Sequence, residues 1–195
     1  MKNKVSILLA ALVIACFAVS CDRQSDYLPK PRGYFRIDLP EKAYTKVDTI
    51  EKYSFECPDY ALITPDPYSP DEKNWVNVEM PQFKGSIHLT HKQVDDNLGE
   101  YLEDMHTMVT KHLQKANGVR DSLIVNDEHH VYGLFIEMDG KGVATPMQFY
   151  LTDSTKNFVR GALYFNFQPN NDSMQPVINF IRADIDHLIE TFEWK

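Results

Sequence analysis

Apolar and polar residues alternate along much of the chain, and this pattern predicts a domain built mainly from β-strands. Two alternating runs, at 74–80 and 84–91, are joined by a short turn and predict a hairpin. Three longer apolar runs are separated by turn-forming residues and predict an antiparallel meander. The predicted strands are 34–40, 53–57, 74–80, 84–91, 122–125, 131–138, 147–152 and 158–167.

Two helices are predicted where apolar residues recur every three or four positions. The first covers 96–116, and Gly118 is a suitable residue for the turn that ends it. The second begins within the segment PNNDS at 169–173 and ends near Trp194. Its apolar stripe is interrupted only by Asp184.

Both faces of the predicted meander carry large apolar side chains, so neither face is plainly exposed to water. We place Leu134 and Ile136 on the same face as Phe149 and Leu151, with a second apolar set on the opposite face. Cover is therefore expected on both faces. The predicted fold class is α+β, a mainly antiparallel sheet of about five to seven strands with a helix packed on each face, which makes an α/β/α sandwich.

The first 20 residues resemble a secretory leader. Lys2 and Lys4 precede an apolar stretch that is short for a membrane span, and small residues then precede a cysteine. The polar residues that follow contain two prolines, which favour an extended chain. We therefore divide the chain into a lipoprotein signal peptide at 1–20, a lipidated cysteine with an extended tether at 21–33, and a single α+β domain at 34–195.

The four residues AVSC, which end at Cys21, resemble the lipobox of bacterial lipoproteins. In proteins with this signal the cysteine is acylated and the leader is cut before it, so the resemblance implies lipidation at Cys21. The sequence VIAC, which ends at Cys16, also fits, and an uncleaved anchor or plain secretion is a third interpretation. Cys21 is favoured because cleavage there exposes the polar sequence DRQSD. Cys57 would then have no disulfide partner, and we interpret it as a core residue.

The net negative charge of the chain argues against nucleic acids and anionic lipid surfaces as partners. The chain contains 28 acidic and 20 basic residues, a formal net charge of −8. Nucleic-acid binding needs a basic surface that replaces the counterions of the phosphates, so we expect no nucleic-acid partner. The same acidity argues against adhesion to anionic lipids through a basic patch. Contact with a membrane is therefore assigned to the lipid anchor.

The sequence contains no motif for catalysis or for a cofactor. Its seven histidines lack the spacing of a zinc site, and it has no nucleophile elbow or phosphate-binding loop. We therefore predict no catalytic residue, no metal and no cofactor. The proline-rich segment at 58–73 is long for a loop, and long loops are often functional.

Arg32, Tyr34, Phe35 and Arg36 form a cationic and aromatic strip in an otherwise acidic protein. One interpretation is a strand whose arginines pair with the protein's own acids. The other is a docking site for a partner beside the membrane, because Tyr and Arg are enriched in the residues that dominate binding energy at interfaces. These four residues are our candidate partner-docking residues.

Several segments together resemble the gliding motility lipoprotein GldD family of Bacteroidota. They occur in the expected order and span nearly the whole chain after the leader. The segments are LPKPRGYFRIDLPEKAY (28–44), HHVYGLFIE (129–137), QFYLTDSTKNFVRGALYF (148–165), PNNDSMQP (169–176) and ETFEWK (190–195).

The resemblance implies a lipid-anchored, non-enzymatic component of the gliding motility and type IX secretion machinery. Its implied partners are the membrane, through the N-terminal anchor, and other gliding or secretion lipoproteins. The implied location is the cell envelope, facing the periplasm, with the choice between inner and outer membrane open. The alternative hypothesis is a periplasmic ligand-binding or hydrolytic lipoprotein with a pocket near the 58–73 loop.

Overall fold

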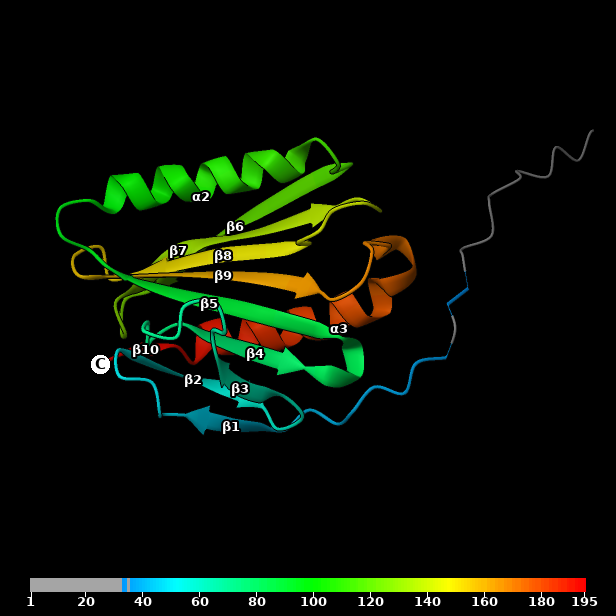
Figure 1. Ribbon diagram of the computed structural model, residues 1–195, viewed down its shortest axis with the longest axis horizontal. Coiled ribbons are helices and arrows are strands. Elements are labelled where there is room, and N and C mark those ends of the chain that lie inside the picture. The colour runs from blue at the N-terminus through cyan, green and yellow to red at the C-terminus, as the bar shows by residue number, and fades with distance from the viewer. Residues whose placement is uncertain (1–32, 35) are drawn as a thin grey trace, which may run out of the picture. The chain divides into compact units, whose positions relative to one another are not determined.

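Residues 36–195 form one compact unit in the computed structural model, which describes residues 33–34 and 36–195 (Figure 1). The elements of this unit are β1 (Tyr44–Val47), β2 (Tyr53–Pro58), β3 (Leu62–Pro65), β4 (Val76–Met80), the 3-10 helix η1 (Pro81–Phe83), β5 (Gly85–Gln93), α2 (Leu98–Leu113), β6 (Gly118–Asn126), β7 (Val131–Asp139), β8 (Met147–Thr152), β9 (Asn157–Phe165), α3 (Asn171–Glu190) and β10 (Glu193–Trp194).

The strands form two antiparallel sheets. The larger has seven strands in the order β3-β4-β5-β9-β8-β7-β6, and the smaller has the order β1-β2-β10. The predicted hairpin is β4–β5, and the predicted meander is β7–β8–β9. The fold is therefore α+β and mostly antiparallel, which confirms that part of the prediction.

The main core lies between one face of the large sheet, α3 and the small sheet. Val177, Ile181 and Ile185 of α3 belong to one buried cluster with residues of β2, β4, β5 and β9. Tyr53 of β2 stacks on Phe192, with ring centroids 5.2 Å apart. Each fully buried side chain of this size contributes about 1.5–3 kcal/mol relative to an exposed one. This face of the sheet is covered by a helix and a second sheet together.

The opposite face of the large sheet is covered only in part. Met105 and Val109 of α2 pack with Ile136 and Met138 of β7 in a smaller cluster. In front of β4 and β5 the same face is open and forms a groove. The predicted sandwich with a helix on each face is therefore only partly what the structure shows.

The register between β7 and β8 corrects our assignment of side chains to faces. Leu134 lies opposite Tyr150, and Phe135 lies opposite Phe149. Because directly opposed residues share a face, Leu134 and Ile136 lie on the opposite face from Phe149. The length of the β7–β8 turn sets this register. The alternation within each strand does not show which residues of the two strands lie opposite each other.

Several predicted boundaries also change. The segment 34–40, predicted as a strand, is not one in the described residues, and the first strand begins at Tyr44. Gly118 begins β6 and does not cap α2. The second helix ends at Glu190, because the Thr191 hydroxyl donates to the carbonyl of His187 and Trp194 then pairs with β2. Neither helix in the described part of the chain is long and apolar enough to cross a membrane.

Candidate binding groove

An open groove lies on the part of the large sheet that α2 leaves uncovered. Its volume is about 790 Å³, and its floor is made by β4, β5 and β9. Pro67 and Tyr68, from the segment after β3, form part of its wall, and Tyr68 is 90% exposed. The polar residues of the floor are Asn77, Glu79, Ser86, His88, Thr90, Arg160 and Tyr164.

Strand register explains why these polar residues share one face. Asn77 of β4 lies opposite His88 of β5, and Thr90 of β5 lies opposite Arg160 of β9. Directly opposed residues point to the same side of a sheet, and successive residues of a strand point to opposite sides. The intervening residues of β4 and β5, such as Val78, are therefore buried under α3.

The groove contains buried polar atoms that have no hydrogen-bond partner. Asn77 is only 3% exposed, yet its Oδ1 atom has no partner among the described residues. The same is true of the Ser86 hydroxyl and of Nε of Arg160. Leaving a buried polar group unpaired costs about 1–3 kcal/mol, so such groups mark places where a ligand gains hydrogen bonds.

Arg160 is one of three charged residues that line the groove, with Glu79 and Lys84. Its Nη2 atom donates to Oε1 of Gln148 at 2.6 Å. Within the described part of the chain no carboxylate forms an ion pair with this guanidinium. Because guanidinium groups bind carboxylates with two parallel hydrogen bonds, Arg160 suits an anionic group presented from the open side.

His88 lies beside Arg160 and is held by an aromatic contact. Its ring meets that of Tyr164 edge-on, with centroids 5.1 Å apart. Burial lowers the pKa of His88, and the charge of Arg160 lowers this pKa further, while Glu79 and Asp66 act in the opposite direction. At neutral pH the imidazole is therefore uncharged and both donates and accepts hydrogen bonds.

The arrangement is suited to binding rather than to bond cleavage. It offers an amide, three hydroxyls, a carboxylate, a neutral imidazole and a guanidinium along three adjacent strands. Ser86 and His88, which lie on the same strand, are not joined by a hydrogen bond, and nucleophilic catalysis needs a base in contact with its nucleophile.

The model of one protein family, the gliding motility lipoprotein GldD family, matches residues 24–194. The chain belongs to this family. The resemblance seen in the sequence is thereby confirmed, and GldD-family membership associates the chain with gliding motility and with the cell envelope.

No curated protein matches this GldD-family chain. Among solved structures, it is similar to the solution structure of cyanobacterial PsbP (CyanoP) from Synechocystis sp. PCC 6803. The TM-score is 0.45 and the sequence identity 12%, over 83% of this chain and 98% of that one.

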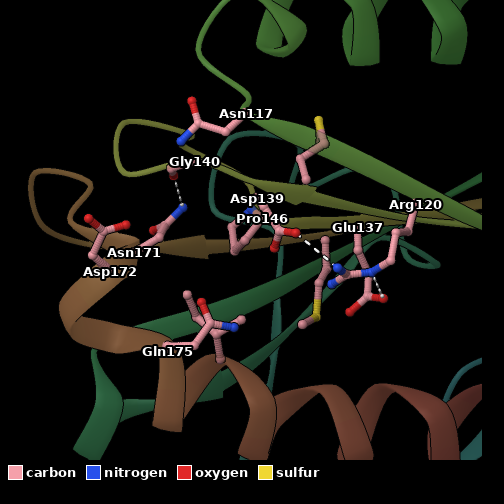
Figure 2. A pocket seen from close by; sticks show the side chains of 12 residues that line it. Asn117, Arg120, Glu137, Asp139, Gly140, Pro146, Asn171, Asp172 and Gln175 are labelled. Carbon is pink, nitrogen blue, oxygen red and sulfur yellow. Dashed lines mark hydrogen bonds and ion pairs between the residues drawn. The ribbon is translucent and has the colours of Figure 1, made fainter. Parts of the chain in front are cut away.

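A second polar hollow in the GldD-family domain, of about 180 Å³, is a structural junction (Figure 2). Arg120 pairs there with Asp139 at 2.9 Å and with Glu137 at 3.5 Å. The Asn171 amide, at the start of α3, donates to the carbonyls of Gly140 and Val143. The Arg120 pairs join β6 to β7, and the Asn171 hydrogen bonds hold the β7–β8 turn against the start of α3.

Asp184, the residue that interrupts the apolar stripe of α3, is 1% exposed and binds three side chains. Its carboxylate accepts hydrogen bonds from the hydroxyls of Tyr44 and Tyr60 and pairs with Lys42 at 2.6 Å. Burial and this carboxylate raise the pKa of both tyrosines. Asp184 therefore attaches the first strand of the domain to α3. The sequence showed only that an acid interrupts the apolar stripe, and did not show this role.

Of the residues predicted as sites, the structure describes Tyr34 and Arg36. Cys21, Arg32 and Phe35 fall outside the described residues. Tyr34 is 49% exposed, and the exposed Arg36 pairs with Asp38 at 3.2 Å. Their role in docking stays a prediction.

The structure also bears on the lone cysteine of the domain and on metal binding. Cys57 is buried in the main core, and burial raises its pKa to about 12. No group of three or more His, Cys, Asp or Glu residues in the described part of the chain is arranged to hold a metal ion. The groove residues were not singled out from the sequence; their signal was the polar half of the alternation in 74–80 and 84–91.

Proposed function

We propose that this GldD-family chain is a lipid-anchored subunit of the gliding motility and type IX secretion machinery that binds and stabilises another envelope protein. The anchor is the acylated Cys21, and residues 22–33 tether the domain. Those 12 residues reach at most roughly 40 Å when extended, so the domain works close to the membrane surface.

The observation that carries the binding role is the set of unpaired polar atoms in the open groove. These atoms of Asn77, Ser86 and Arg160 are buried, and each gains a hydrogen bond when its side chain turns toward a polar segment of a partner in the groove. The guanidinium of Arg160 favours a segment with a carboxylate. Family membership supports the assignment of the partner to the gliding and secretion machinery.

The proposal is tested by capture of tagged full-length chain from detergent-solubilised envelopes. We expect the wild-type chain to recover a defined envelope protein. Arg160→Gln should reduce recovery about tenfold, because a charge-assisted hydrogen bond is lost. Arg160→Lys should restore only part of it, since lysine keeps the charge without the planar pair of donors.

Lys111→Gln is the matched control, because it removes the same charge from an exposed position on α2. It should recover as much partner as the wild-type chain does. Equal recovery by Arg160→Gln, with an unchanged melting temperature, would exclude the groove as the binding site. Failure of the wild-type chain to recover any partner, together with intact secretion after gene deletion, would contradict the proposal itself.

A second candidate function is the binding of a small polar ligand in the envelope. The observation that favours it is that Pro67 and Tyr68, from the 58–73 segment, help to enclose the groove. Native mass spectrometry of the chain purified from its own cells distinguishes the two functions. A bound small molecule that is lost in Arg160→Gln supports the ligand, and its absence beside a captured protein supports the partner.

A further inference from the structure

The outermost strand β6 has the features of a strand that accepts another strand. It ends the order of the large sheet and pairs along all nine residues with β7 only (Figure 1). An edge strand directs half of its N–H and C=O groups away from the sheet, where they can pair with an added chain. The other edge of this sheet, β3, is four residues long and contains Pro65, so it is shorter and lacks one donor.

One face of β6 exposes large apolar side chains. Leu123 is 80% exposed, Val125 is 66% exposed and Val119 is 44% exposed. They share one face of the strand with the exposed Asp121 and lie opposite Leu134, Tyr132 and Met138 of β7. Natural edge strands usually carry charges or prolines at such positions, which prevent unwanted pairing. On this face Asp121, opposite Ile136, supplies such a charge in the first half of β6. Leu123 and Val125, in the second half of the strand, have no charge between them.

The opposite face of β6 borders two hollows that are rich in carboxylates. They have volumes of about 260 and 400 Å³ and lie between β6 and the last turns of α3. Ile124 and Ile189 give both hollows an apolar floor. The acidic residues that line them are Asp127, Glu128, Asp186 and Glu190, and no basic residue lines either one.

These carboxylates are incompletely neutralised. Asp186 pairs with Arg182 at 3.3 Å, but Glu128 and Glu190 form no hydrogen bond or ion pair with any described residue. Burial raises the pKa of Asp186, and the neighbouring charges of Glu137 and Glu190 also raise it, against the effect of Arg182. Several acids therefore repel one another beside the free edge.

We propose that the outer edge of β6 binds an extended segment of a partner protein in which apolar and basic side chains alternate. The segment pairs with the main chain of β6 and extends the seven-stranded sheet. Because side chains of a strand alternate between faces, its apolar residues lie beside Leu123 and Val125, and its lysines or arginines reach Asp186 and Glu190. The inference rests on the proposed binding role, but not on the groove.

A second copy of this chain is a poorer occupant than a basic segment. Pairing of two β6 strands would bring together two acidic edges that contain Asp127, Glu128 and Glu190. Like charges across a new interface oppose association. Charge complementarity therefore selects a basic partner.

The test uses synthetic heptapeptides and the full-length chain in neutral detergent. The probe alternates valine and lysine, with blocked ends and a fluorescent label, and its binding is measured by anisotropy. One control peptide replaces lysine with glutamate, and another carries N-methyl groups on alternate residues, which remove main-chain donors. We expect the lysine peptide to bind, and each control peptide to bind at least about tenfold more weakly.

Two variants of the chain locate the site. Leu123→Lys places a charge on the free edge at a position that is 80% exposed, so folding should be unaffected. It should weaken binding of the lysine peptide about tenfold, and Glu190→Gln should weaken it several-fold, with a smaller salt dependence. The matched control is Leu113→Lys, at a half-exposed position on α2, which should bind as the wild-type chain does.

The proposal is overturned if the glutamate or N-methyl peptide binds equally well, or if Leu123→Lys leaves binding unchanged. It is also overturned if light scattering shows a wild-type dimer that Leu123→Lys dissociates. Failure here is distinguishable from failure of the groove. Capture of the envelope partner by Arg160→Gln reports on the groove, and binding of the lysine peptide by Leu123→Lys reports on the edge, so either proposal can fail while the other holds.

Discussion

At the residue scale, the most informative position is Asp184, a carboxylate at 1% exposure in the middle of an apolar helix face. A buried acid is costly unless it is paired and hydrogen-bonded. Here Lys42, Tyr44 and Tyr60 supply three donors from the first third of the chain. Asp184 therefore attaches the N-terminal part of the domain to α3, although it interrupts the apolar face of that helix.

Replacement of Asp184 by asparagine should destabilise the domain by about 2–4 kcal/mol, because Lys42 loses its counter-charge and two hydroxyls lose a charged acceptor. Urea denaturation followed by fluorescence measures the change. Asp104→Asn, at an exposed position on α2, is the control and should change the free energy of unfolding by less than about 0.5 kcal/mol. Equal effects of the two substitutions would contradict the role assigned to Asp184.

His91 predicts a pH dependence of stability. It is 8% exposed, and burial lowers its pKa; Lys52 lowers it further, while the hydrogen bond to Asn157 and the charges of Glu72 and Asp153 oppose the change. The unfolded chain therefore binds a proton at a higher pH than the folded chain does. The contribution of His91 to stability is complete above its unfolded pKa, about 6.5, and is lost as the pH falls below that value.

The measurement is the free energy of unfolding of the wild-type chain and of His91→Gln between pH 7.5 and 5. The wild-type chain should lose stability on acidification, and His91→Gln should lose less. His106→Gln, on the exposed side of α2, should keep the wild-type slope. A slope that is the same in all three proteins would mean that other groups cause the acid sensitivity.

At the element scale, the close pairing of β7 with β8 depends on a glycine. A Cβ atom on Gly133 would lie 1.8 Å from the carbonyl oxygen of Tyr150. Gly99, in the first turn of α2, has nothing within 4 Å of such an atom. Gly133 is therefore required for steric reasons, whereas packing does not explain the glycine at position 99.

Alanine substitutions at these positions should have opposite signs. Gly133→Ala should cost more than about 2 kcal/mol, because the clash is with main chain that cannot move without breaking the sheet. Gly99→Ala should stabilise the domain by about 0.5–1 kcal/mol through helix propensity. Thermal or urea unfolding measures both, and a neutral Gly133→Ala would mean that the strand pairing is looser than described.

At the scale of the whole molecule, the chain combines a proposed lipid anchor, a short tether and a domain with two distinct free surfaces. One is the polar groove over β4, β5 and β9, and the other is the apolar and acidic edge at β6. Two strands of the sheet, β8 and β7, separate β9 from β6 at the end of the order, so the two surfaces can be altered independently. A lipid-anchored domain with two such surfaces is suited to hold two components together.

Membrane attachment should depend on Cys21 alone. Cys21→Ala should abolish incorporation of labelled fatty acid and move the chain out of the washed membrane fraction, since several acyl chains are needed for stable anchoring. Cys16→Ala should leave both properties unchanged. Fatty acid incorporated by Cys21→Ala and lost in Cys16→Ala would reverse the assignment.

The sequence by itself determined the class of the fold, the main hairpin and meander, both helices and the family. These features depend on local periodicity and on ordered segments, which a single chain displays directly. Some element ends were not predicted: no strand is found in the described residues of 34–40. The helix expected to reach Trp194 ends at Glu190, because Trp194 pairs with β2, which is remote in the sequence.

Only the tertiary structure decided which faces are open. The register of β7 on β8 separates Leu134 from Phe149, and the placement of α2 leaves a groove open over β4, β5 and β9. The position of β6 along the chain does not indicate that this strand lies at the edge of the sheet. Register and edge position depend on turn geometry and on contacts between remote segments, so the surfaces proposed for binding are properties of the folded molecule and not of any one segment.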